Sequence, residues 1–170
     1  MLSDLALIAE IVGAIAVIIT LAFIGYELKD NTKSTRSATA SAAAATTSSW
    51  YSELGDNEQS SALFLQFMQN PDDLTPELRF QASMKLHGFL VIMQNSYYLA
   101  REGTLDKEIL SYISGAILAV DNQPGWQWFW KQRKAMFFVE FQEYVDALDT
   151  DGVEHSRGFF KQPTPSTGQP

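Results

Sequence analysis

The chain contains no cysteine, which excludes disulfide frameworks, thiolate zinc sites, iron–sulfur clusters and cysteine nucleophiles. It carries no Walker A, GxSxG, HExxH or GxGxxG sequence either. Basic residues are few, since 12 Lys and Arg stand against 20 Asp and Glu, for a formal net charge of −8. Phosphate neutralisation needs a basic surface, so this balance argues against a nucleic-acid partner. The composition therefore favours neither an enzyme nor a nucleic-acid-binding protein, and it implies no cofactor and no metal.

One long apolar run stands near the start of the chain, at residues 5–26, with 22 residues and a single charge. As a helix it reaches roughly 33 Å, enough to cross a hydrocarbon core of about 30 Å. A cleaved signal peptide would carry a basic region first and a shorter apolar run. We therefore expect residues 1–28 to form a single transmembrane anchor. The alternative is a buried core helix.

Cations after the run predict its orientation. Lys29, Lys33 and Arg36 follow the apolar residues, whereas the residues given before them contain no Lys or Arg. Lys and Arg stay cytoplasmic more readily than they are translocated. We expect the N-terminus outside and the remaining chain in the cytoplasm, a reducing compartment with which the lack of cysteine agrees.

Small residues recur along the run and beyond it. Within the run they share one helix face that would allow another helix to approach closely, and they are Ala6, Ala9, Gly13 and Ala16. Glu10 is a costly intramembrane carboxylate, which either faces a protein interior or reaches outward to the headgroups or is protonated. Residues 29–54 are rich in Ala, Ser and Thr and form either a helix or a linker, with Ala42 and Ala45 among the candidates for close packing. These features predict a homo-oligomer or a membrane protein complex.

Helical periodicity continues through residues 55–148, and no segment shows sustained period-two alternation. The expected helices cover residues 58–69, 75–102, 106–120, 126–137 and 140–148. The second of these begins with a capping Thr75 and a first-turn Pro76 and ends near Gly103. Its core-facing stripe is Leu78, Ala82, Leu86, Phe89, Met93 and Tyr97. The fold class is therefore all-α, with a transmembrane helix, a small helical bundle and a polar, Pro-rich tail at 149–170.

Polar side chains interrupt the 75–102 helix and suggest a ligand site. Gln94 and Asn95 lie within an apolar run and could contact a polar ligand together with Tyr97, Tyr98 and Arg101. Alternatively, these groups bond to backbone or to another helix. His87 has no carboxylate at helical spacing, so we interpret it as a structural or surface residue.

The segment 126–138 is unusually rich in aromatic residues. Trp126 and Trp130 share a predicted stripe with Phe137 and Phe141, and the cations Lys131, Arg133 and Lys134 accompany them. Trp favours the headgroup region and cations favour anionic lipid, so these residues could form a membrane-surface helix. The alternative is an aromatic core with solvated cations.

Four blocks of sequence carry a resemblance: EIVGAIAVIITLAFIGYEL, KDNTKSTRSA, NSYYLAREGTLDKEI and PGWQWFWKQR with FFVEFQEYVD. Together they resemble a widespread bacterial family of small, membrane-anchored helical proteins to which no biochemical role is assigned. The resemblance implies an anchored helical domain in the bacterial inner membrane, and it transfers no catalytic residues.

We thus expect a single-pass membrane protein in contact with lipid. Its expected role is structural, accessory or scaffolding, by self-assembly or by docking on a larger membrane complex. The alternative is a membrane-tethered sensor of a lipid or small ligand.

Overall fold

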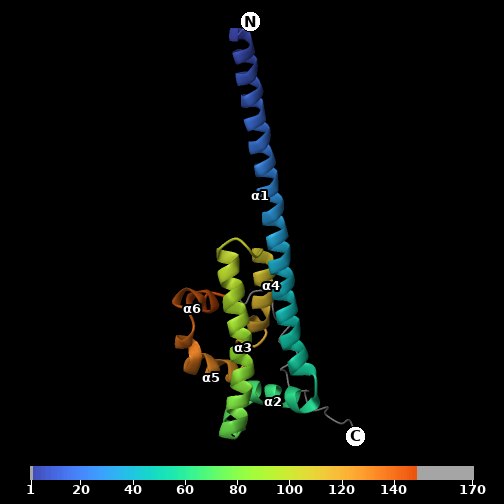
Figure 1. Cartoon of the computed structure of the whole chain (residues 1–170). Coiled ribbons are helices and arrows are strands. Elements are labelled where there is room, and N and C mark those ends of the chain that lie inside the picture. The colour runs from blue at the N-terminus through green and yellow to red at the C-terminus, as the bar shows by residue number, and fades with distance from the viewer. Residues whose placement is uncertain (1, 149–170) are drawn as a thin grey trace, which may run out of the picture. The chain divides into compact units, whose positions relative to one another are not determined.

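The structure is a computed structural model that describes residues 2–148, with side chains from residue 9 onward. These residues form six α-helices and two short 3-10 helices and contain no strand, which confirms the all-α prediction (Figure 1). In chain order the elements are α1 (Leu2–Gly55), α2 (Glu58–Gln69), η1 (Pro71–Asp73), α3 (Pro76–Arg101), α4 (Lys107–Leu118), α5 (Pro124–Arg133), η2 (Lys134–Met136) and α6 (Val139–Asp146). The tail at 149–170 and the side chain of Ala6 lie outside the described residues. The chain divides into two units, Met1–Thr39 and Ala40–Pro170.

The first unit is helical, and its apolar side chains from residue 9 onward are exposed. Within the described residues, α1 holds one stretch long and apolar enough to cross a membrane, with a mean hydropathy of 2.2, and none of that stretch is buried. By length and composition this stretch therefore fits the predicted span. Thr20 Oγ1 donates a hydrogen bond to the Ala16 carbonyl at 2.9 Å, so this hydroxyl is satisfied within the helix. A helix in lipid requires such internal pairing, because hydrocarbon offers polar groups no partner.

The second unit begins with the C-terminal part of α1. Ala43 and Thr47 are buried there, and Trp50 and Leu54 pack partly buried against the core, at spacings of three and four residues. Trp50 joins this helix to α3, because its Nε1 donates to the Lys85 carbonyl at 2.8 Å. Its ring centroid also lies 4.5 Å from that of Phe89.

The helix α2 has the predicted bounds, and it buries one face, which consists of Leu63, Phe64, Phe67 and Met68. Its first turn is fixed by Asn57, whose Oδ1 accepts a hydrogen bond from the Ser60 amide at 2.8 Å. The cap and the apolar face both involve residues that are close together in the sequence. This helix could therefore be predicted from the sequence.

The helix α3 also begins as predicted, with the Thr75 hydroxyl accepting from the Leu78 amide at 3.4 Å. It ends before Gly103, whose φ of +74° is the left-handed conformation that favours glycine. The core-facing stripe is buried from Ala82 to Met93, but Leu78 is exposed, contrary to prediction. Leu78 lies in the first turn, where it borders a surface hollow together with Gln81.

The last helices differ from prediction in their bounds. The expected helix at 126–137 ends earlier, at Arg133, and Phe137 is extended, with φ −101° and ψ 161°. After the break the Phe138 amide donates to Gln94 Oε1 at 2.8 Å, a long-range bond outside the helical ladder. The short α6 then starts at Val139 and buries Phe141 and Val145.

Candidate functional site

The bundle carries an apolar groove of about 850 Å³ within the second unit. Four helices border it: the last turns of α1, together with α2, α3 and α4. Its lining residues are Trp50, Tyr51, Leu54, Gly55, Ser61, Phe64, Leu65, Leu86, Phe89, Ser111, Tyr112, Gly115, Ala116, Ile117, Ala119 and Val120. This volume falls within the roughly 300–1,000 Å³ of ligand-binding pockets.

The residues that line the groove differ in how far they are buried. Leu86 and Phe89 of α3 are buried, and they form the floor. Tyr51, Leu65 and Tyr112 are exposed and stand at the rim, with Tyr112 78% exposed. Large apolar side chains are normally covered, and a group of them beside a hollow marks a binding surface.

Small residues on α4 keep the groove open. Ser111, Gly115 and Ala119 recur every four residues, so they lie in one row along the helix. A Cβ added at Gly115 would meet no atom within 4 Å, so the space beside this residue is free in the structure.

The lining is uncharged. None of the residues that border the groove is Asp, Glu, Lys, Arg or His, and its polar groups are mainly the hydroxyls of Tyr51, Ser61, Ser111 and Tyr112. Burial raises the pKa of Tyr51 above its ordinary value, and the nearby Tyr112 adds to the shift. Tyr51 therefore remains a neutral hydroxyl at physiological pH. The groove suits apolar, uncharged groups.

Of the five predicted ligand residues, Tyr98 and Arg101 contact each other, and none of the five lines this groove. Gln94 bonds to the Phe138 amide, as described above, and Tyr97 packs 4.8 Å from the Tyr144 ring. Asn95 and Tyr98 are exposed, and the Arg101 Cζ lies 5.2 Å from the Tyr98 ring centroid. Of the two alternatives stated for Gln94, the structure shows the bond to backbone.

The predicted membrane-surface segment is largely core. Trp126 is only 6% exposed and stacks on Trp130 at 5.4 Å between ring centroids, so its prediction as a membrane-surface residue is wrong. Trp130 and Lys134 both bond to Asp146 of α6, and Arg133 Nη1 donates to Met136 Sδ at 3.2 Å. Lys131 is exposed. Of the two alternatives stated for this segment, the aromatic core agrees with the burial of Trp126, Phe129 and Phe137.

Asp146 links α6 to Trp130 of α5 and to Lys134 of η2. The Trp130 Nε1 donates to its Oδ1 at 2.9 Å, and the Lys134 ammonium donates to its Oδ2. The hydrogen bond from Lys134 has the largest effect on the pKa of Asp146 and lowers it. Burial opposes this shift, and the hydrogen bond from Trp130 and the charge of Lys134 add to it, so the pKa lies below its usual range. A lowered carboxyl pKa means that the folded state is stabilised above the ordinary pKa of about 3.9, and that this stability is lost as the pH falls through the lowered value.

We expect Asp146→Asn to lower the free energy of unfolding at pH 7 by about 0.5–1 kcal/mol, the range for partly exposed ion pairs. The effect is small because the Asp146 and Lys134 side chains are 44% and 38% exposed. Denaturant unfolding of both proteins at pH 7 and at pH 2.5 measures it. The difference should shrink at pH 2.5, and an unchanged difference would contradict this role for the carboxylate.

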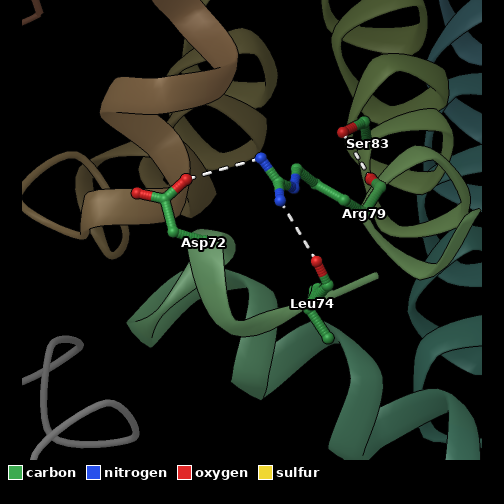
Figure 2. Close-up of polar contacts among 4 residues, drawn as sticks. All are labelled: Asp72, Leu74, Arg79 and Ser83. Carbon is green, nitrogen blue, oxygen red and sulfur yellow. Dashed lines mark hydrogen bonds and ion pairs between the residues drawn. The ribbon is translucent and has the colours of Figure 1, made fainter. Parts of the chain in front are cut away.

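A second polar cluster surrounds Arg79, which sequence reasoning did not single out. Figure 2 shows its guanidinium between η1 and α3, with Nη1 3.4 Å from Asp72 Oδ1 and Nη2 donating to the Leu74 carbonyl at 3.1 Å. The same group lies 5.6 Å from the Trp128 ring centroid. These contacts tie the η1 turn to α3 and α5, and we interpret the cluster as structural.

His87 has aromatic neighbours. Its ring lies 5.1 Å from that of Phe137, and its Nδ1 is buried without a hydrogen-bond partner in the described residues. Burial lowers the pKa of His87, and the positive charge of Arg133 lowers it further. This environment agrees with a neutral, packed imidazole.

No group of three or more His, Asp or Glu side chains that could hold a metal ion occurs among the described residues. A search of protein-family models, curated proteins and solved structures finds no match to the chain.

Proposed function

We propose that the chain is a single-pass membrane protein with a structural or accessory role, not an enzyme. The observation that carries this proposal is the apolar stretch of α1, which is long enough to span a bilayer and has no buried part. Exposed apolar surface of this extent is costly in water, because burying it in hydrocarbon is worth about 25 cal/mol per Å². In a bilayer, lipid hydrocarbon covers the apolar side chains of this stretch.

The proposed location is the bacterial inner membrane, with the N-terminus outside and the bundle in the cytoplasm. The cations that follow the apolar stretch, Lys29, Lys33 and Arg36, support this orientation, and all three are exposed.

Self-assembly or docking on a larger membrane complex is the proposed mode of action. Ala9, Gly13 and Ala16 are exposed on α1, as are Ala42 and Ala45 further along it. A Cβ added at Gly13 would meet nothing within 4 Å, so another helix can approach this point closely. Glu10 is exposed on the same helix and is a candidate for a polar contact with such a helix.

Mass measurement of the full chain in native nanodiscs tests this mode of action. We expect a single assembly of fixed stoichiometry larger than one chain, and a shift toward the monomer in Gly13→Leu, because the added side chain separates the helices. Val17→Leu is the matched control, since it changes an exposed residue of the same helix that is already large. A monomer without a bound partner in all three proteins would contradict the proposal.

A second candidate function is favoured by a different observation, the uncharged groove between α1, α2, α3 and α4. A membrane-tethered module with such a groove is suited to bind a lipid or another apolar ligand. This candidate and the structural role are compatible, because one uses the bundle and the other uses the anchor.

A further inference from the structure

We propose that the groove binds a long acyl chain of an uncharged lipid, such as an acylglycerol. This inference rests on the second candidate function and names its ligand class. It follows from the volume of the groove, from the charge of its lining and from the row of small residues on α4.

The groove can enclose a chain-like ligand. It offers about 850 Å³ between a buried floor, which includes Phe89, and an exposed rim that includes Tyr112. Gly115 borders this space, and a Cβ added there would meet no atom within 4 Å. Each methylene group that enters such a site contributes about 0.8 kcal/mol, so a long chain is favoured over a short one.

Charge complementarity favours a neutral lipid over a fatty-acid anion. None of the lining residues carries a charge, so a carboxylate inside the groove would find no cation to compensate its desolvation. An ester group requires only hydrogen-bond donors, and the hydroxyls of Tyr51 and Ser111 provide them at the edge of the groove.

A second copy of the chain fits the groove less well. A stable protein interface buries about 800 Å² on each partner. The groove offers only three exposed large side chains for such a contact, Tyr51, Leu65 and Tyr112. A ligand inside the groove also contacts the buried residues Leu86 and Phe89. A flat contact between two copies does not reach them.

Photolabelling of the full chain tests the inference. The probe is a diacylglycerol with a diazirine on one acyl chain, added to the protein in phosphatidylcholine nanodiscs, with labelled peptides identified by mass spectrometry. We expect label on residues 50–54 and 111–120, suppressed by excess dioleoylglycerol and much less by oleate. We also expect label on residues 9–26, from probe molecules dissolved in the bilayer.

Two matched glycine substitutions provide the control. Gly115 and Gly88 both lie inside helices, and an added Cβ meets no atom within 4 Å at either position. Gly115→Leu fills the groove and should lower labelling of residues 111–120 by roughly tenfold, the effect of a modest steric overlap. Gly88→Leu lies outside the groove and should leave it unchanged. Ser111→Leu is a second filling variant and should act as Gly115→Leu does.

The outcomes separate the groove from the anchor. Label on residues 9–26 without label in the groove would overturn the inference and leave the anchor supported. Label in the groove without label on residues 9–26 would support the inference and contradict the anchor. Equal suppression by oleate, or equal loss of groove labelling in Gly88→Leu, would also overturn the inference.

Discussion

Gly125→Ala should destabilise the bundle more than alanine at any other glycine inside its described helices. A Cβ at this position would lie 2.2 Å from the Phe67 carbonyl oxygen and 2.7 Å from Met68 Cα, both backbone atoms of α2. Backbone cannot rotate away as a side chain can, so α2 and α5 must separate. Overpacking typically costs about 1–3 kcal/mol, and we expect the upper end of that range or more.

Thermal unfolding followed by circular dichroism measures this effect. A loss of about 3 kcal/mol should lower the Tm of a domain of this size by about 10 °C or more. Gly88→Ala and Gly115→Ala are the controls, because their added methyl groups meet nothing within 4 Å. Alanine is the better helix former by about 1 kcal/mol, so both controls should be neutral or stabilising. A Gly125→Ala melting curve that coincides with wild type would contradict the close packing of α2 on α5.

The paired substitution Ile15→Asp and Ile19→Asp should release the chain from the membrane. Both residues are exposed near the middle of the apolar stretch, so their side chains face lipid if the stretch spans a bilayer. Each aspartate at the centre of a transmembrane helix costs about 2.5–3.5 kcal/mol, and the pair therefore lowers partitioning by roughly four orders of magnitude.

Extraction of membranes with alkaline carbonate measures this loss. Wild-type protein should remain in the pellet, and the paired variant should appear in the supernatant or fail to integrate at all. Ser37→Asp with Ser41→Asp is the control, because both serines are exposed on α1 outside the apolar stretch and have the same spacing. Retention of the Ile15→Asp and Ile19→Asp protein in the pellet would show that this stretch is not what holds the chain in the membrane.

Elements with local signals were predictable from the sequence. The α2 helix has a capping residue, Asn57, and an apolar face whose spacing is complete within the helix itself, and its bounds were predicted correctly. Beyond α5 the chain makes a long-range contact instead: the Phe138 amide donates to Gln94 Oε1, 44 residues earlier. No local pattern encodes such a contact, so the helix was predicted too long.

The groove was not predicted from the sequence, for a related reason. The row of Ser111, Gly115 and Ala119 is visible in the sequence, and so is the neighbouring Tyr112. Small residues on a helix normally allow a neighbouring helix to approach, and only the structure shows that here they border a hollow. The sequence likewise did not decide whether Trp126 is buried, because an aromatic stripe is compatible with a core and with a membrane surface.

The accessibility of single cysteines along α1 tests the central claim most directly, and the absence of native cysteine makes every introduced one unique. Val12→Cys, Ile18→Cys and Phe23→Cys should resist a water-soluble maleimide in sealed vesicles, because their side chains lie in hydrocarbon. Ser34→Cys should react in inside-out vesicles and be protected in right-side-out ones. Reaction of the three apolar positions as fast as Ser34→Cys would show that α1 is exposed to water and does not anchor the chain.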